Sequence, residues 1–105
     1  MQAVNFNAPG QVVIAGDATA VARAIAACKA KGAKRAMPLP VSAPFHSSLM
    51  QPAAMRLREA LARVQIKAPP VALINNVDVA EETDPARIRD ALVRQAAAPV
   101  RWVET

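Results

Sequence analysis

The fold class is decided by residues 11–32, which read QVVIAGDATAVARAIAACKAKG. The β-branched start of this stretch predicts a strand over 11–15, and the Gly-Asp pair that follows ends it. Asp17 is a favourable N-cap for a helix over 18–31, whose apolar stripe includes Cys28 as a small core residue. A strand that leads directly into a helix predicts an α/β fold.

The same alternation continues on both sides of this stretch. Further elements are expected as a strand over 4–7, a strand candidate over 34–41, a helix from Ser47 or Ser48 to Val64, a buried parallel strand over 71–74 and a helix over 85–96. Pro38 and Pro40 argue against a central, fully paired strand over 34–41. Pro52 fits the long helix only within its first turn, where backbone N–H groups lack helical partners.

Composition excludes several classes of protein. The chain has 105 residues, enough for one small domain, with 53% hydrophobic and only 3% aromatic residues. It is too apolar to be disordered, and no apolar run approaches the ~20 residues of a membrane span. Cys28 and His46 are the only residues of their kinds, which excludes a disulfide scaffold and a Cys-rich zinc site. The lone thiol and the absence of a visible signal peptide predict a cytoplasmic location.

The positive charge lies mainly in the middle of the chain. Residues 18–77 carry nine basic side chains and one acidic one, whereas residues 78–105 are net acidic. A basic segment favours an anionic partner such as nucleic acid, an acidic protein or a phosphate-bearing cofactor, although it also fits a solvated face. The scarcity of aromatic side chains disfavours binding of single-stranded nucleic acid.

His46 is the main candidate for chemistry. It lies in the sequence Pro-Phe-His-Ser-Ser, between a strand-like stretch and a helix, where an imidazole can serve as a general base. A capping or surface histidine fits the same position. Ser42, Ser47 and Ser48 are the only serines, and none lies in a nucleophile elbow, so we expect Ser47 or Ser48 to cap the helix.

A second candidate site follows the expected buried strand. Asn75, Asn76 and Asp78 come where that strand ends, at the edge of a sheet that lines ligand crevices in open α/β folds. Asn and Asp also favour turns, so turn chemistry explains these residues equally well.

Four stretches, taken in order, resemble bacterial malonyl-CoA:acyl carrier protein transacylases. They are residues 5–16, 33–50, 75–78 and 88–95, and the likeness extends over essentially the whole chain. The resemblance implies that residues 1–39 are the later half of a ferredoxin-like small subdomain. It implies that residues 40–105 are part of an α/β-hydrolase-like acyltransferase core.

The resemblance also implies a reaction. His46 matches the family's catalytic histidine, which activates a serine that takes malonyl from coenzyme A and passes it to the phosphopantetheine thiol of acyl carrier protein. The coenzyme A thioester is then a substrate, and no cofactor, membrane or nucleic acid is implied. Phe45 resembles the residue of the malonyl-selecting polyketide synthase acyltransferases, and Asn75 and Asn76 are candidate substrate-binding residues.

The family's partners give the basic segment a role. Acyl carrier proteins and coenzyme A are anionic, so the following residues are candidate steering charges: Lys29, Lys31, Lys34, Arg35, Arg56, Arg58 and Arg63. The family's Gly-His-Ser-x-Gly motif, its carboxylate-binding arginine and the glycine-rich segment that orients its histidine are all missing. The chain is therefore expected to be an inactive internal fragment of an enzyme. The alternative is a non-catalytic basic domain that binds an acidic carrier protein or nucleic acid.

Overall fold

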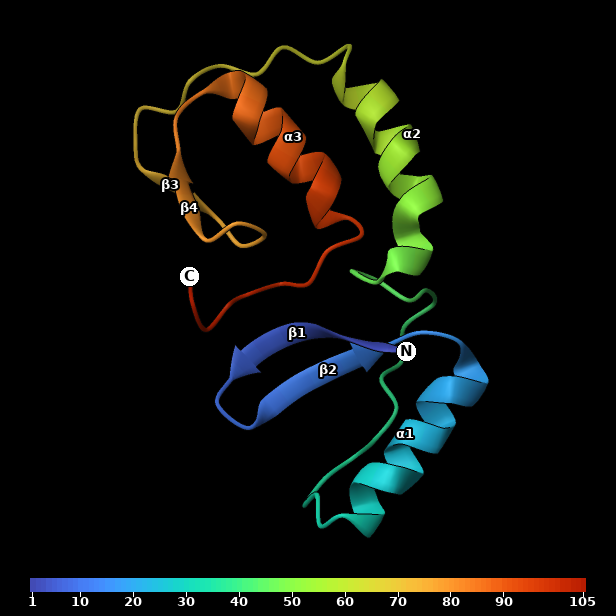
Figure 1. Ribbon diagram of the computed structural model, residues 1–105. Helices are drawn as coiled ribbons and strands as arrows, with labels where there is room; N and C mark the ends of the chain where they lie inside the picture. Colours follow the sequence, from blue (N-terminus) through green and yellow to red (C-terminus); the bar gives the residue numbers. More distant parts are fainter.

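The computed structural model describes residues 1–105. Figure 1 shows a strand hairpin with one helix at one end of the molecule, and a pair of helices with a smaller hairpin at the other. The elements are β1 (Gln2–Ala8), β2 (Gln11–Ala15), α1 (Ala18–Ala30), the 3-10 turn η1 (Ser48–Met50), α2 (Gln51–Leu61), β3 (Leu73–Asn75), β4 (Ala80–Glu82) and α3 (Pro85–Gln95).

The N-terminal hairpin confirms both strands predicted there. β1 and β2 are antiparallel, with Phe6 opposite Val12, and Pro9 and Gly10 form the turn between them. Gly10 has φ 79°, a left-handed conformation that glycine adopts without steric cost. The register shifts beside Val4, and this irregularity leaves the Val4 carbonyl available to another segment.

The first helix begins and ends close to its predicted bounds but is weakly packed. Asp17 holds the N-cap position without a side-chain capping bond, and no residue of α1 is buried. Cys28 is exposed, so the prediction of a core cysteine is wrong. Val21 and Ile25 are half-buried, whereas the C-terminal part of α1 lies away from the hairpin, where nothing in the chain covers the apolar stripe (Figure 1).

The strand candidate over 34–41 is also wrong. The segment is an irregular connection from α1 to η1. Pro38 and Pro40 have no N–H to donate to a ladder, and the one backbone bond within the segment is local, from the Val41 N–H to the Leu39 carbonyl (2.8 Å).

The two later helices confirm their predictions with small changes at the ends. The expected long helix starts as η1 and continues as α2, with Pro52 in its first turn, but it stops at Leu61 instead of Val64. α3 begins as predicted, because Asp84 caps it by accepting a hydrogen bond from the Ala86 N–H (3.0 Å). None of the helices is long and apolar enough to cross a membrane.

α2 and α3 pack side by side and supply most of the core (Figure 1). Four of the six buried residues belong to this pair: Ala54, Ile88, Ala91 and Val93. Arg89 of α3 also donates to the Val64 carbonyl beyond the end of α2 (2.8 Å). A cation at this end of a helix interacts favourably with its dipole.

The strand predicted over 71–74 differs most from expectation. β3 pairs antiparallel with β4 through a four-residue turn, whereas a buried parallel strand was expected. Val71 is 70% exposed and Ile74 51% exposed, because the chain places no second strand or covering helix over these apolar side chains. The apolar run therefore predicted a strand correctly, but the prediction of a parallel neighbour was wrong.

An ion pair fastens this second hairpin to α3. The Arg94 guanidinium donates to both oxygens of Asp78 in the β3–β4 turn (2.7 and 2.6 Å) and, through Nε, to Asp90 one turn earlier in α3 (2.7 Å). These contacts lower the pKa of the Asp78 carboxyl, chiefly through the hydrogen bonds from Arg94.

The two ends of the molecule are joined by the C-terminal segment. The Val100 N–H donates to the Val4 carbonyl (2.7 Å), and the Phe6 N–H donates to the Val100 carbonyl (3.0 Å). Val100 and Asn5 thus form a parallel bridge beside β1. Figure 1 shows this segment between the upper helices and the lower hairpin, and Val4 beneath it is 1% exposed.

The chain does not close a full core. Six of its 105 residues are buried. Its radius of gyration is 16.0 Å, against about 13 Å for a compact domain of this length. Its accessible surface is 7374 Å², against roughly 5,700 Å² for a compact monomer of this mass. Large apolar side chains therefore remain in contact with water.

We expect Val4→Ala to lower the free energy of unfolding by about 2 kcal/mol in urea, since the change removes buried methyl groups at the junction of the two ends. Val12→Ala on the partner strand is the matched control. Val12 is 50% exposed, so its loss should cost less than about 0.5 kcal/mol. Equal losses for the two variants would contradict the placement of Val4 in the core.

We expect the isolated chain to self-associate, because exposed apolar patches above a few hundred Å² drive association. Val71 is uncovered, and Leu57, Leu61 and Leu73 are half-buried. Ile88 adds nothing to such a patch, because it is 8% exposed. Sedimentation over a range of concentrations checks this prediction. A single monomeric species with no dye-binding apolar surface would contradict it.

The Asp78–Arg94 pair should make stability depend on acid pH. The folded chain holds the Asp78 proton more weakly than the unfolded chain, whose carboxyl has the ordinary pKa of 3.8. The contribution is therefore complete above that pH and is lost as the pH falls through the lower folded value. We expect Asp78→Asn to flatten the acid loss of unfolding free energy by less than about 1 kcal/mol, because the pair is exposed. Glu81→Gln, at an exposed and unpaired carboxylate of the same hairpin, should leave the slope unchanged.

Candidate active site

His46 lies on a tight turn that the chain fixes locally. The Ser47 hydroxyl and the Ser47 N–H both donate to the Pro44 carbonyl, at 2.6 and 3.2 Å. The Ser47 carbonyl then accepts from the Met50 N–H (3.0 Å), which starts η1. Ser47 is 1% exposed, so this turn is a packed part of the structure rather than a free loop.

The backbone of His46 itself is in the left-handed region, with φ 63°. Such a conformation is uncommon for a residue with a side chain and costs of order 1–3 kcal/mol, which the surrounding contacts must offset. Conformations of this kind cluster at functional sites. The strain is therefore a structural reason to place chemistry at His46.

One ring nitrogen of His46 is occupied. Nδ1 lies 2.9 Å from the Gln95 main-chain carbonyl, and 3.5 Å from the Gln95 side-chain amide nitrogen, which is the limit of a hydrogen bond. A carbonyl oxygen only accepts, so the shorter contact requires that Nδ1 carry the proton. Nε2 of the neutral ring then has a free lone pair, as a general base requires.

Gln95 is the last residue of α3, and its position adds an electrostatic effect. The carbonyl groups at the C-terminal end of a helix carry partial negative charge. The half-buried His46 side chain is thus held and oriented by two elements far apart in the sequence.

Gln95 is a functional residue that the sequence did not reveal. The family resemblance implies that a glycine-rich segment outside the chain orients the histidine, whereas a carbonyl within the chain makes this contact. The only available signal is positional, because Gln95 ends a helix that the sequence predicts. A main-chain carbonyl leaves no mark in the side-chain pattern.

None of the three serines pairs with the histidine. The Ser47 hydroxyl is used within the turn, and it bonds backwards to Pro44 instead of capping the helix ahead. Ser42 and Ser48 are exposed, and neither side chain makes a hydrogen bond. The Ser48 N–H donates instead to the Gln2 side chain of β1 (2.9 Å), which fastens the turn from its other side.

Phe45 precedes the histidine on the same turn and is 45% exposed. Asn75 is engaged in turn chemistry. Its Oδ1 accepts from the Asp78 N–H (2.7 Å), and its Nδ2 donates to the Ala80 carbonyl (3.4 Å). The Asn76 side chain makes no hydrogen bond within the chain, and the Asn76 carbonyl accepts from the Arg101 N–H (2.9 Å).

The predicted steering charges fall into two groups that do not meet. Lys29, Lys31, Lys34 and Arg35 lie at and beyond the C-terminal end of α1, whereas Arg56, Arg58 and Arg63 lie on and just after α2. Figure 1 places these two helices at opposite ends of a molecule that is 49 Å long. All seven side chains are exposed, but they form two basic surfaces rather than one.

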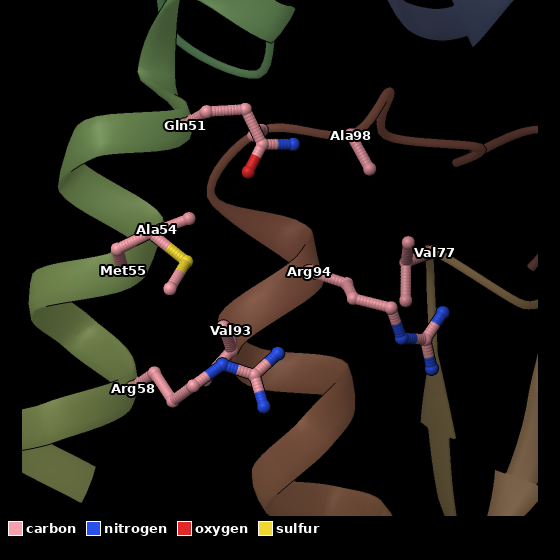
Figure 2. A pocket seen from close by; sticks show the side chains of 9 residues that line it. Gln51, Ala54, Met55, Arg58, Val77, Val93, Arg94 and Ala98 are labelled. Atoms are coloured by element: carbon pink, nitrogen blue, oxygen red, sulfur yellow. The ribbon is translucent and has the colours of Figure 1, made fainter.

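A shallow hollow of about 220 Å³ lies between α2, α3 and the β3–β4 turn. Figure 2 shows Arg58 and Met55 on the α2 side, and Arg94 on the α3 side with its guanidinium toward Val77. His46 does not line this hollow. The histidine and this hollow are therefore separate features of the structure, and the His46 side chain is half-buried.

Comparison with known proteins gives consistent matches over nearly the whole chain. A malonyl CoA-acyl carrier protein transacylase of Salmonella typhimurium is 63% identical over 102 residues, which cover 97% of this chain. The crystal structure of an acyl-carrier-protein S-malonyltransferase from Burkholderia pseudomallei superposes with a TM-score of 0.96 at 65% identity, over 98% of this chain and 34% of that one. A malonyl-transacylase in complex with a type II PKS acyl-carrier protein gives a TM-score of 0.95 at 56% identity, over 99% and 34% of the two chains. No protein-family model matches.

The chain spans only part of the length of these relatives. It spans 33% of the length of the Salmonella protein, and 34% of the length of a Haemophilus influenzae transacylase that is 58% identical. The structural superpositions cover the same share, and they show that the open arrangement of helices and strands occurs within larger folded proteins. In sequence and in fold, the chain corresponds to about one third of a malonyl CoA-acyl carrier protein transacylase.

Proposed function

We propose that this chain supplies the general base of a malonyl transacylase, and that the base is His46. The observation that carries the proposal is the 2.9 Å contact between Nδ1 and the Gln95 carbonyl, which leaves Nε2 free to accept a proton. The enzyme would transfer malonyl from coenzyme A to the phosphopantetheine thiol of acyl carrier protein. The nucleophilic serine would lie outside these 105 residues.

The reaction divides into two half-reactions with the same base. In the first, Nε2 takes the serine hydroxyl proton while the serine oxygen attacks the thioester carbonyl of malonyl-CoA. The carbon–sulfur bond then breaks, and the proton passes to the departing coenzyme A sulfur. In the second, Nε2 takes the proton of the carrier-protein thiol, whose sulfur attacks the serine ester, and the proton returns to the serine oxygen. The cycle consumes no cofactor.

The two ends of the molecule support a division into subdomains. We propose that residues 1–39 are the later half of a ferredoxin-like subdomain and residues 40–105 are part of an α/β-hydrolase-like core. The irregular connection over 34–41 supports a boundary there. The pairing of Val100 with β1 would then be the junction between the subdomains.

Phe45 is proposed as a specificity residue. It is exposed and directly precedes the base in the sequence, and an α-substituent on the malonyl group would meet its ring. Asn76, whose side chain is free of hydrogen bonds, is the better placed of the two asparagines to contact substrate, since Asn75 is committed to its turn.

Carrier protein and coenzyme A are the proposed partners. Both are anionic, and the two basic surfaces suit them. Because these surfaces lie at opposite ends, we propose that they serve different partners or different stages of encounter. A cytoplasmic location fits the single unpaired thiol. The alternative of a non-catalytic basic domain gains no support, because the relatives are named as transacylases.

The test is His46→Ala in a complete transacylase that contains this sequence. Loss of a general base should lower malonyl transfer by about 10²–10⁴-fold, followed as malonyl-carrier protein by mass spectrometry. Ser48→Ala is the matched control, because this neighbouring side chain makes no hydrogen bond, and it should retain transfer within about twofold. Near-normal transfer by a folded His46→Ala protein would overturn the proposal.

The 105-residue chain alone provides a second check. Incubated with malonyl-CoA and carrier protein, it should form neither malonyl-carrier protein nor a stable malonyl adduct. Malonyl found on Ser42, Ser47 or Ser48 would show that the nucleophile lies within the chain and would contradict the proposed division of roles.

A further inference from the structure

We propose that the Asp78–Arg94 ion pair is a positioning device for His46. Arg94 directly precedes Gln95, whose carbonyl holds the imidazole. The ion pair and the histidine contact therefore involve consecutive residues of α3. The inference rests on the proposed function only for its catalytic consequence, since the contacts exist whatever the chain does.

The end of α3 needs an external support. Beyond Arg94, the N–H groups of Ala96, Ala97 and Ala98 bond to carbonyls only three residues earlier in the chain. These hydrogen bonds have long donor–acceptor distances, 3.3, 3.2 and 3.4 Å. Helix ends held in this way fray. Fraying would move the Gln95 carbonyl, which belongs to this same turn, away from Nδ1.

The Asp78 carboxylate supplies that support. It accepts two parallel hydrogen bonds from the Arg94 guanidinium, at 2.7 and 2.6 Å. A bidentate pair fixes both distance and orientation, which a single contact does not. Figure 2 shows the Arg94 side chain extended from α3 toward Val77 of the β3–β4 turn.

The turn that carries Asp78 is itself rigidly held. The Asp78 N–H donates to the Asn75 side chain (2.7 Å), and the Asn76 carbonyl accepts from the Arg101 N–H (2.9 Å). Val79 has φ 55°, a rare conformation for a β-branched residue. Val79 and His46 are the two non-glycine residues of the chain with positive φ. They lie at the two ends of the contact series from Asp78 through Arg94 and Gln95 to the imidazole.

Asp90 provides the matched control. It accepts from the same guanidinium at 2.7 Å and is 49% exposed, against 39% for Asp78. Asp90 lies within α3, four residues before Arg94, so its loss leaves the contact to the second hairpin intact. A general effect of removing a carboxylate from Arg94 would appear in both variants, whereas positioning of the helix end would appear in Asp78→Asn alone.

The experiment measures the tautomer of His46 by the ¹⁵N chemical shifts of its ring, in a complete transacylase that contains this sequence, at about pH 8, above the ~6.5 at which a free imidazole titrates. The unaltered chain and Asp90→Asn should show the Nδ1–H form as the dominant species. Asp78→Asn should convert the majority of the ring to the Nε2–H form, because the Gln95 carbonyl no longer holds the proton on Nδ1. Arg94→Lys, which keeps the charge and loses the fork, should give the same change.

In a complete transacylase with this sequence, Asp78→Asn should lower kcat about tenfold and leave the KM for malonyl-CoA unchanged. Asp90→Asn should stay within about twofold. An Nδ1–H population that is unchanged in both Asp78→Asn and Arg94→Lys, or equally reduced in Asp90→Asn, would overturn the inference. A tautomer change in an inactive complete protein would instead refute the proposed function and uphold the positioning role.

Discussion

Two main-chain hydrogen bonds of Val100 hold this molecule together. They join the C-terminal segment to β1, where the Val103 N–H adds a third bond, to the Phe6 carbonyl (3.0 Å). Through them the histidine turn is enclosed by a ring of contacts. Ser48 is bonded to Gln2 of β1, β1 to Val100, the adjacent Arg101 to the β3–β4 turn, and that turn through Arg94 to the end of α3. The geometry of His46 therefore depends on residues at both ends of the chain.

The helices and the first hairpin could be predicted from local signals, and the rest could not. Asp84 followed by Pro85 marks the start of α3, and the β-branched run before Gly16 marks β2. Burial is a property of what surrounds an element, so Cys28 and the strand at Leu73 kept their predicted local structure and lost their predicted partners. An apolar run indicates that its side chains should be buried, but it does not indicate which segment buries them.

The candidate site divides along the same line. His46 could be identified because a single imidazole on a turn before a helix is visible in the sequence. Its protonated nitrogen and its partner could not, since both depend on the carbonyl of a residue 49 positions away. Its strained backbone conformation could not be predicted either, because the residue type does not reveal it. The distribution of charge was visible as well, but the separation of α1 from α2 in space was not.

The two prolines in the connection over 34–41 have a consequence for how the chain meets other molecules. Met37, Leu39 and Val41 alternate along it and are 53–60% exposed. In a strand, this pattern would form an aggregation-prone edge. The intervening prolines remove alternate backbone donors, so a neighbouring strand finds no continuous ladder to extend. This apolar segment is thus open to side-chain packing while it resists growth into a cross-β fibril.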